Sequence, residues 1–441
     1  MAEQTLTRTL PSKFVLAVVV GGVIGLGILR GPGEIAQVIP DPLGYLSLWF
    51  LGGLFVLLST AVTAELVGMT PRSGGTYTLI RRAFGPYPGF VLGWVDWLSF
   101  AGDIAIKAVV ILEFTVFLFP ECEPWRTPLA IMVTTVFVAF QLRGIVLGAF
   151  IQQVATAVIG LIIVGLALLL FWVEAPVIAA AETAPAKTSF NSWSLVIASI
   201  IFTYDGWLYA SYFSGEIKGG AGAVARSCIK GVVVVIALYM LLNVALVQSV
   251  GLAAIAGSDL ALARALELTF SPAAGSAVVV AAIVILLSHQ NLGYMGAPRV
   301  LQALAVDGLA VQQAQTVGKG GNPIFGVLIT WALVVGLILL GGFEFLLLLC
   351  VFFFVPLYLA LIIGVMILRK REPDTERPYR AWGHPYSTIL CLVGWTLVTL
   401  FQAYAERETA VYALGMVAVS WPVYRYLTRN PQLPTREETG T

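Results

Sequence analysis

Residues 21–33 read GGVIGLGILRGPG, and this run decides the fold because it puts helix-breaking residues inside an apolar segment. The surrounding stretch, residues 14–38, is long enough to cross a membrane, since a spanning helix needs about 20 mostly apolar residues. Glycine is a poor helix former, and Pro32 has no backbone donor. Non-helical backbone at membrane depth is tolerated only where protein or a water-filled cavity satisfies its polar groups. We therefore expect a broken helix here, in preference to an unbroken helix that packs through small residues.

A second apolar segment carries a similar interruption. Residues 202–207 read FTYDGW, and the segment runs on to GEIKGG at 215–220. An aspartate in an apolar span is costly unless it faces a polar interior. The two interruptions fall in the first and sixth predicted spans, five helices apart, which is typical of two five-helix halves related by inverted topology. We expect the functional site where the broken helices meet.

The composition indicates that lipid surrounds most of this chain. The 441 residues are 59% hydrophobic and 11% charged, with a mean hydropathy of +0.91. A soluble globular chain carries roughly 25% charged residues. The net charge of +1 gives no basic surface for nucleic acid. Four scattered cysteines and two histidines form no metal or haem motif, so we expect no cofactor and no metal ion.

Apolar runs predict an all-α membrane protein with twelve spans and no cleavable signal peptide. We expect one transporter domain over residues 1–441, with inverted repeats at 14–173 and 192–368 and two extra helices within 386–427. The predicted spans lie near residues 14–38, 46–68, 92–119, 128–142, 147–173, 192–216, 231–252, 273–303, 324–342, 345–368, 386–404 and 408–427.

Lysine and arginine residues predict the orientation, because cytoplasmic loops carry an excess of them. With both termini in the cytoplasm, 19 of the 25 residues of these two types fall on the cytoplasmic side. Four fall outside, namely Arg126, Lys187, Arg264 and Arg407. An odd number of spans would remove this asymmetry. We expect a multi-pass protein of a cell (inner) membrane.

The chemistry of two facing helix breaks suits a zwitterion. Exposed N–H groups at the N-terminus of a half-helix attract a carboxylate. Exposed carbonyl groups at the opposing C-terminal ends accept hydrogen bonds from an ammonium group. One amino acid satisfies both sets without a charged side chain in the pocket.

The motifs that flank these breaks are similar to those of a known family. The chain resembles the amino acid–polyamine–organocation superfamily, in particular its L-type-like amino-acid permeases, over nearly its whole length. The motifs that carry this resemblance are GVIGLGILRGPG at 22–33, PRSGGTY at 71–77, RAFG at 82–85, GW at 93–94, YDGW at 204–207, EIK at 216–218, PRVL at 298–301, DGL at 307–309 and RPYR at 377–380.

The resemblance implies a five-plus-five inverted-repeat fold and a binding site in the unwound parts of spans one and six. By position, the N–H groups of Gly25, Leu26 and Gly27 would hold the substrate carboxylate. The substrate amine would contact carbonyl groups, namely those of Val23, Ile24, Phe202 and Asp205. Thr203 and Gly206 complete this predicted site. Phe202 falls where the family has an aromatic gate; the alternative is a packing aromatic.

One departure from the family concerns the coupling ion. Several relatives carry a lysine in span five that links spans one and eight, and Ile159 stands at that position here. The lysine link is therefore absent. Ser288 in span eight could give one oxygen to a sodium ion, although a serine in a helix more often bonds its own preceding turn.

Span three contains ionisable residues, which are functional suspects inside a membrane. Asp103 and Lys107 are four residues apart, so they share a helix face and can pair. The pair could be a self-neutralising structural element. Alternatively, Asp103 lies in the pocket, because residues 102–105 (GDIA) resemble the GNIA of a bacterial arginine–agmatine exchanger. If the carboxylate of Asp103 is free, it would favour a substrate with a cationic side chain or a polyamine. If Lys107 neutralises it, a neutral amino acid fits better.

Arg30 and Glu34 are also four residues apart, at the outer end of span one. They could gate the outer vestibule or steer substrate, or they could form a simple helix-end pair. Glu113, towards the outer end of span three, is interpreted as structural.

Together these features predict a secondary transporter, an exchanger of neutral amino acids that works by alternating access. A proton- or sodium-coupled symporter is the nearest alternative, and a transporter of cationic amino acids or polyamines is another. A membrane enzyme would need clustered catalytic residues, which the spans do not contain, so we expect no catalysis. The expected partners are the small-molecule substrate and the lipid membrane, with the chain a monomer or homodimer.

Overall fold

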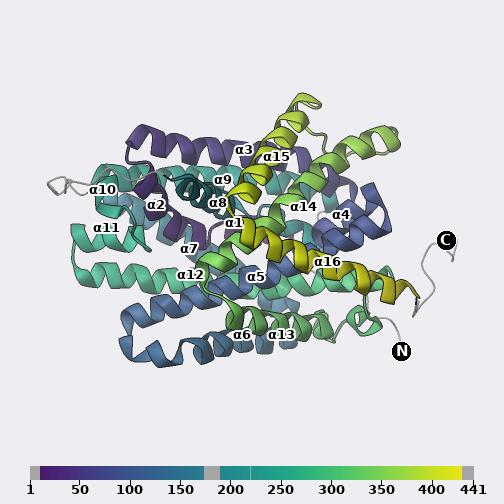
Figure 1. The fold of residues 1–441 in the computed structure, drawn as a ribbon, viewed down its shortest axis with the longest axis horizontal. Coiled ribbons are helices and arrows are strands. Elements are labelled where there is room, and N and C mark those ends of the chain that lie inside the picture. Colours follow the sequence, from purple (N-terminus) through teal and green to yellow (C-terminus); the bar gives the residue numbers. More distant parts are fainter. Residues whose placement is uncertain (1–9, 173–188, 219, 430–441) are drawn as a thin grey trace.

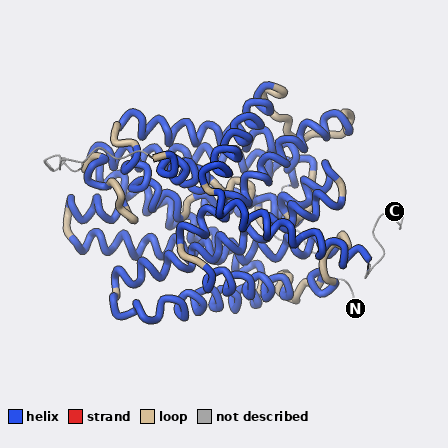
Figure 2. Tube along the Cα trace, viewed as in Figure 1, coloured by secondary structure: helices blue, strands red, loops and turns tan. Residues whose placement is uncertain are grey.

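The computed structural model describes residues 10–172, 189–218 and 220–429. Arg8, Lys187 and Arg436, which entered the charge count, lie outside these residues. Every regular element in the described part is a helix, and one isolated parallel bridge pairs Leu10 with Ile217 (Figure 2). The all-α prediction is confirmed.

The described helices follow one another along the chain with short connections (Figure 1). Their bounds are α1 Ser12–Val23, α2 Leu26–Val38, α3 Pro42–Met69, α4 Gly75–Phe84, α5 Pro86–Leu118, η1 Pro120–Trp125, α6 Arg126–Arg143, α7 Ile145–Phe171, α8 Phe190–Tyr204, η2 Tyr209–Glu216, α9 Gly220–Ser249, α10 Leu252–Ile255, α11 Ala261–Thr269, α12 Pro272–Val306, η3 Gln312–Gln315, α13 Ile324–Leu340, α14 Phe343–Arg371, α15 Tyr386–Ala405 and α16 Arg407–Arg429.

Eight helical segments of the described chain are long and apolar enough to cross a membrane. They include the α1–α2 pair, which counts as one segment over Lys13–Val38. The other predicted spans coincide with α5, with α8 followed by η2, with α13 and with α16. Helix α8 has 15 residues and α13 has 17, and α5 carries several ionisable side chains, so length or charge sets these three apart. Helix α16 has 23 residues but is less apolar.

Helix bounds differ from the predicted spans where polar residues continue a helix. Helix α9 begins at Gly220 and not near residue 231, because Arg226 and Lys230 are helical although they are too polar for an apolar run. For the same reason the hydropathy pattern missed the amphipathic helices α4 and α11. Apolarity marks the part of a helix that meets lipid, whereas backbone hydrogen bonds decide where the helix ends.

Both predicted breaks are present. Helix α1 ends at Val23 and α2 begins at Leu26, and between them Ile24 is extended and Gly25 has a non-helical backbone (φ −143°, ψ −141°). Helix α8 ends at Tyr204, and a turn over residues 205–208 leads into the 3₁₀ helix η2.

Local signals fix several helix starts. The side chain of Asp41 accepts a hydrogen bond from the N–H of Gly44 at 2.6 Å, and Pro42 occupies the first position of α3. Ser271 and Pro272 open α12 in the same way, with the serine hydroxyl accepting from the N–H of Ala274. A capping oxygen satisfies an otherwise unpaired donor, and proline suits the first helical position.

Loops predicted on the same side of the membrane gather at the same end of the bundle. Arg72 pairs with Asp307 at 2.8 Å, Arg82 pairs with Glu372 at 2.6 Å, and the N–H of Ile145 donates to the carbonyl of Gly320 at 2.9 Å. We call this the Arg72 end; it includes α4, at the right in Figure 1.

The opposite end contains α10, α11 and the distal part of α2, at the left in Figure 1. We call it the Arg30 end, because Arg30 pairs there with Glu113 on α5 and with Asp259 in the segment before α11. The N–H of Gly257 also donates to the carbonyl of Gly33 at 2.9 Å. The pattern of shared ends agrees with helices that alternate in direction.

The outer helices expose large apolar side chains. Leu161 on α7 is 74% exposed, Leu397 on α15 is 62% exposed and Leu414 on α16 is 68% exposed. The core lies instead around α5, which packs against both α12 and α14. Exposed apolar faces of this kind fit a lipid surrounding.

Candidate functional site

The two broken segments contact each other through glycines. Gly206, in the turn after α8, has a φ of 103°, and a Cβ atom built there would lie 2.4 Å from the carbonyl oxygen of Gly22. A Cβ atom on Gly27 would lie 2.3 Å from the Cα of Thr203. A backbone atom cannot move aside as a side chain does, so both positions require glycine. The predicted meeting of the broken helices is confirmed.

Tyr239 on α9 links the ends of both broken helices. Its hydroxyl lies 2.8 Å from the carbonyl oxygen of Val23 and 3.1 Å from that of Thr203. The prediction did not include this tyrosine, because a single aromatic residue in an apolar span gives no distinctive signal. The hydroxyl carries one hydrogen, so Tyr239 donates to one of these carbonyls at a time and places α9 against the ends of both α1 and α8.

The backbone groups predicted to bind substrate lie within this junction. The carbonyl of Phe202 accepts a hydrogen bond from the N–H of Asp205 at 3.3 Å. Each carbonyl can accept a second bond, so those of Val23 and Phe202 retain capacity. Leu26 and Gly27 lie in the first turn of α2, where N–H groups have no partner within the helix. Ile24 and Gly25 form the connection between the two helices. Binding of substrate by these groups stays a prediction.

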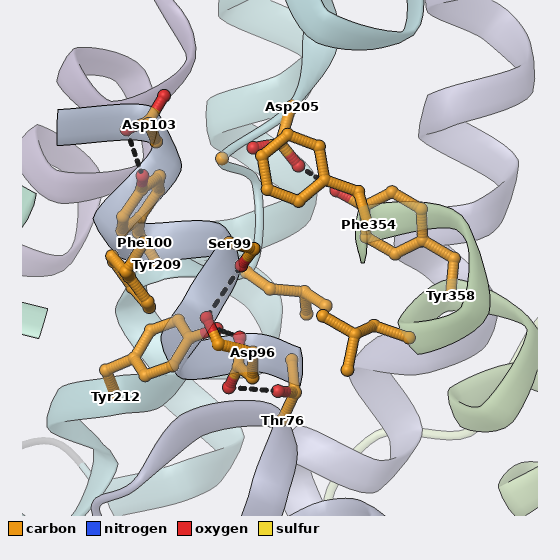
Figure 3. A pocket seen from close by; sticks show the side chains of 13 residues that line it. Thr76, Asp96, Ser99, Phe100, Asp103, Asp205, Tyr209, Tyr212, Phe354 and Tyr358 are labelled. Carbon is orange, nitrogen blue, oxygen red and sulfur yellow. Dashed lines mark hydrogen bonds between the residues drawn. The ribbon is translucent and has the colours of Figure 1, made fainter. Parts of the chain in front are cut away.

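A buried cavity of about 40 Å³ lies beside the turn after α8 (Figure 3). Two predicted site residues with side chains, Asp103 and Asp205, line it, as does Gly206. The remaining lining residues come from α4, α5, η2 and α14 and from Leu208 in the turn itself. A cavity of this size holds only a few water molecules, so it must widen to admit an amino acid.

A second cavity, of about 10 Å³, is lined by Phe202 together with Leu26, Gly27 and Arg30. The ring of Phe202 stacks on that of Phe354 with centroids 6.4 Å apart, and Phe354 lines the first cavity. The stacked pair therefore contributes one ring to the lining of each cavity. The role of Phe202 as an aromatic gate stays a prediction.

Three carboxylates reach the first cavity, and in the described part of the chain only Asp103 of the three forms an ion pair. The Nζ of Lys107 lies 2.6 Å from Asp103, whose carboxylate also accepts from the hydroxyl of Tyr209 at 3.2 Å. Asp205 accepts a hydrogen bond from the hydroxyl of Tyr358 (Figure 3). Among the described residues, neither Asp205 nor Asp96 takes part in an ion pair.

Asp96 is a carboxylate of the cavity that the sequence prediction missed. It is buried and accepts hydrogen bonds from the hydroxyls of Thr76 and Tyr212, the latter at 2.7 Å (Figure 3). Asp96 precedes Asp103 by seven residues, which is two helical turns, so the two share a face of α5. That spacing was the signal that could have found it.

The comparison with known families agrees with this geometry. The sequence model of the family described as amino acid permease matches residues 14–421. The chain belongs to the amino acid permease family. This family is part of the amino acid–polyamine–organocation superfamily, as the motifs predicted. The permease is therefore a multi-pass membrane protein of an amino-acid transporting family, and the paired helix breaks are its candidate site.

Individual relatives of the permease are distant. The serine/threonine exchanger SteT of Bacillus subtilis is 25% identical over 403 residues, which cover 89% of this chain and 90% of SteT. The uncharacterized amino acid permease YvbW of the same organism is 24% identical over 94% of this chain and 97% of its own length. The b(0,+)-type amino acid transporter 1 of Oryctolagus cuniculus is 26% identical over 52% of this chain and 49% of its own.

In the permease, polar side chains of α7 within two turns of Ile159, where the resemblance places a lysine in several relatives, contact α1 and α12. Ile159 is fully buried and offers no polar atom. Thr156, almost one turn earlier, donates a hydrogen bond to the carbonyl of Ala17 on α1 at 3.0 Å, so it links α7 to α1. Ser288 donates to the side chain of Gln152 at 3.4 Å and not to its own preceding turn. The prediction missed Thr156 and Gln152.

At the Arg30 end, one arginine joins three segments. The guanidinium group of Arg30 lies 3.0 Å from Glu113 on α5 and 2.5 Å from Asp259, whereas its distance from Glu34 is 3.9 Å. It also lies over the ring of Phe343 at 3.8 Å. A simple pair with Glu34 therefore describes Arg30 too narrowly, and Glu113 is one of its main partners.

At the Arg72 end, a buried pair and a surface cluster close the bundle. Arg299 on α12 donates to both carboxylate oxygens of Glu216, at 2.7 and 3.0 Å, and both side chains are almost fully buried. Nearer the surface, Asp307 pairs with Arg72 and with Arg81 on α4. The permease is thus closed at both ends in this conformation.

Proposed function

We propose that this permease is a secondary active transporter that exchanges neutral amino acids by alternating access. The observation that carries this proposal is the contact between two helix breaks from distant parts of the chain. Gly22 meets Gly206, and Gly27 meets Thr203, beside a buried cavity. The similarity to a serine/threonine exchanger supports both the exchange mode and neutral substrates.

The proposed architecture has twelve spans in two inverted halves of five, followed by α15 and α16. Eight of these spans are the segments that are long and apolar enough to cross a membrane. The other four are α5, α8, α13 and α16, whose residues match the remaining predicted spans. Helix α8 is short because the chain leaves the helix at Asp205, as α1 does at Ile24. A break at the same place in each half is typical of such repeats.

In the proposed binding mode, the substrate carboxylate lies at the N-terminus of α2, on the N–H groups of Gly25, Leu26 and Gly27. The substrate ammonium group lies against the carbonyls at the ends of α1 and α8. The helix dipoles favour this orientation, because the N-terminus of a helix is positive and a C-terminus is negative. The side chain of the substrate then points towards the cavity lined by Asp205.

Transport requires the two closed ends to open in turn. In our proposal four spans, formed by α1 with α2, by α3, by α8 with η2 and by α9, move as a bundle against the remaining helices. Tyr239 fits this division, because its hydroxyl on α9 lies within hydrogen-bond distance of carbonyls at the ends of α1 and of α8. The Arg72 end faces the cytoplasm in this proposal, with both termini on that side, since most lysine and arginine residues fall there. The unit is a monomer or homodimer in an inner membrane.

A second candidate function is transport of cationic amino acids or polyamines. The observation that favours it is the presence of Asp96 and Asp205 beside the cavity, each with hydroxyl donors but no cation among the described partners. A buried carboxylate without a cation is unfavourable, so a substrate amine would stabilise it. Proton- or sodium-coupled symport is a further alternative.

The test uses purified protein in liposomes loaded with serine. Labelled neutral, cationic and anionic amino acids and putrescine are offered outside, with and without imposed proton and sodium gradients. Exchange predicts uptake of neutral amino acids only into loaded vesicles, whatever the gradient. Gradient-driven uptake into empty vesicles would replace exchange by symport. If folded protein takes up no compound of this set, the proposal fails.

A matched pair of variants separates the neutral from the cationic candidate. If the substrate is neutral, the variants Asp205→Asn and Asp374→Asn should take up the same set of amino acids. Asp374→Asn is the control, because Asp374 is exposed in a loop at the Arg72 end. For a cationic substrate, Asp205→Asn alone should lower arginine or putrescine uptake by about tenfold or more, since a charged contact contributes about 1.5–3 kcal/mol.

A further inference from the structure

His289 on α12 lies against the break in α1. Its imidazole is buried, and the two ring nitrogens face different backbone carbonyls. Nδ1 lies 3.2 Å from the carbonyl oxygen of Ile285, one turn earlier on α12, and Nε2 lies 3.2 Å from the carbonyl oxygen of Gly22 on α1. A Cβ atom on Gly25 would lie 2.8 Å from Nε2, so the ring packs directly on the broken segment.

The two contacts require two donors from one ring. A carbonyl oxygen only accepts, and a neutral imidazole carries one N–H, so it can hydrogen-bond to only one of these carbonyls. The other nitrogen would then direct its lone pair at an oxygen. A protonated imidazole carries an N–H on each nitrogen and satisfies both carbonyls. The arrangement of acceptors around His289 therefore fits the doubly protonated ring.

The charges that face His289 come from one neighbouring helix. Asp103 and Lys107 on α5 both act electrostatically on the ring, and they pair with each other at 2.6 Å. Tyr209 on η2 donates to Asp103. Helix α7 contains no ionisable side chain, and neither does the part of α1 next to its break. Asp103 and Lys107 oppose each other, burial of the ring disfavours its protonated form, and the two carbonyl acceptors favour that form.

We propose that His289 is a proton-binding site and that its protonated ring joins α1 to α12 through the carbonyl of Gly22. Loss of the proton removes one of the two hydrogen bonds and weakens this junction. The consequence for transport rests on the proposed function, in which α1 moves relative to α12. Protonation then holds the permease in the closed conformation of this structure and slows exchange.

The first experiment measures proton binding without transport. The chain has two histidines, His289 and His384, so protein labelled with isotopes only in histidine gives two sets of ring signals. The variant His384→Gln leaves the signals of His289 alone. We expect these signals to titrate between about pH 5 and pH 8, the range in which histidine changes charge. Signals that stay constant over this range, in protein shown to be folded, overturn the proposal.

The second experiment measures exchange in serine-loaded liposomes as a function of pH for the wild type, His289→Gln and His384→Gln. Glutamine can still donate one hydrogen bond to Gly22 but cannot be protonated in this range. We expect the exchange rate of the wild type and of His384→Gln to fall by about tenfold from about pH 8 to pH 5, which corresponds to about 1.4 kcal/mol. The rate of His289→Gln should stay constant.

An equal pH dependence in the wild type and in His289→Gln overturns the proposal. If the wild type exchanges no amino acid at any pH, the proposed function fails instead. In that case the titration of the His289 ring signals still tests, without transport, whether His289 binds a proton. The two failures are therefore distinguishable.

Discussion

Arg299 and Glu216 form the most completely buried ion pair of the described chain, with side-chain exposures of 0% and 2%. Each loses its hydration on folding and depends on the other for compensation. Removing one partner of such a pair leaves an uncompensated charge, at a cost of about 3–5 kcal/mol. We therefore expect Arg299→Met to lower the temperature of thermal inactivation strongly, as measured by size exclusion after heating.

The double variant Arg299→Met with Glu216→Leu is the control for this prediction. It removes both charges and leaves apolar side chains, so it should regain much of the lost stability. Arg264→Met provides a surface comparison, because its pair with Glu267 is exposed and should contribute little. Equal losses for Arg299→Met and Arg264→Met would contradict the prediction.

Glu372, in the loop after α14, gives the permease a dependence on acid pH. The guanidinium group of Arg82 donates hydrogen bonds to this carboxylate and lowers the pKa of Glu372 below its ordinary value of 4.5. A carboxyl group with a lowered pKa stabilises the folded state above its ordinary pKa, and this contribution is lost as the pH falls through the lowered pKa.

We therefore expect Glu372→Gln to lower the midpoint of thermal unfolding by about 1–2 °C at neutral pH, because a half-buried pair near the surface contributes little. The difference from the wild type should shrink below about pH 4. Scanning fluorimetry at several pH values measures it. Asp374→Asn, in the same loop, should show no such trend. If Glu372→Gln lowers the unfolding midpoint by the same amount at every pH, the result would argue against the Arg82 contact.

The contact between α2 and α8 depends on the lack of a side chain at Gly27. An alanine Cβ there would overlap the backbone of Thr203, and neither helix can shift without moving the junction. Overpacking of this kind costs about 1–3 kcal/mol. We expect Gly27→Ala to reduce exchange and thermal stability together, as measured in liposomes and in detergent.

Gly165→Ala in α7 is the matched control. A Cβ atom on Gly165 meets no atom within 4 Å, and the position is exposed. Alanine is a better helix former than glycine, so stability should stay the same or rise. If Gly27→Ala behaves like Gly165→Ala, the close approach of α2 and α8 is not needed for transport.

The molecule as a whole is closed by two polar layers, one at each end of the bundle. Arg30 joins α2, α5 and the segment before α11, and Asp307 joins α12 to α4 and to the loop before it. A transporter that alternates between two open states must break each layer in turn. Weakening one layer should therefore raise the population that is open at that end.

A cysteine placed in the cavity can report this shift. The experiment uses a variant in which the four native cysteines are replaced and Ser99 is changed to cysteine (Ser99→Cys). Residue 99 lines the cavity, so the new cysteine is its only thiol probe. We expect Arg30→Gln to raise its labelling by an impermeant maleimide added at the Arg30 end, and Asp307→Asn to raise it at the Arg72 end. Loss of about 1 kcal/mol changes the population ratio about fivefold.

Glu267→Gln serves as the control for the labelling experiment, because its pair with Arg264 is exposed and joins two residues of one helix. It should leave both labelling rates unchanged. Equal effects of Arg30→Gln at the two ends would exclude a gate at the Arg30 end.

The sequence predicted the helices better than it predicted the cavity. Apolar runs located the long helices, and the glycines and prolines of residues 21–33 located the first break. Asp103 and Asp205 were found because a carboxylate in an apolar span is unusual. Asp96 was missed although it has the same character, since its relation to Asp103 is visible only when residues are compared two turns apart.

By itself, the sequence determined that this protein is an all-helical chain in lipid with two interrupted helices, because hydropathy and the conformations of glycine and proline are local properties. Only the tertiary structure decided which groups the interruptions bring together. The hydroxyl of Tyr239 reaches the carbonyl of Val23, the ring of His289 reaches that of Gly22, and Arg30 finds Asp259. In each pair the partners lie more than 200 residues apart, so no local pattern contains the contact. Packing of the helices sets it.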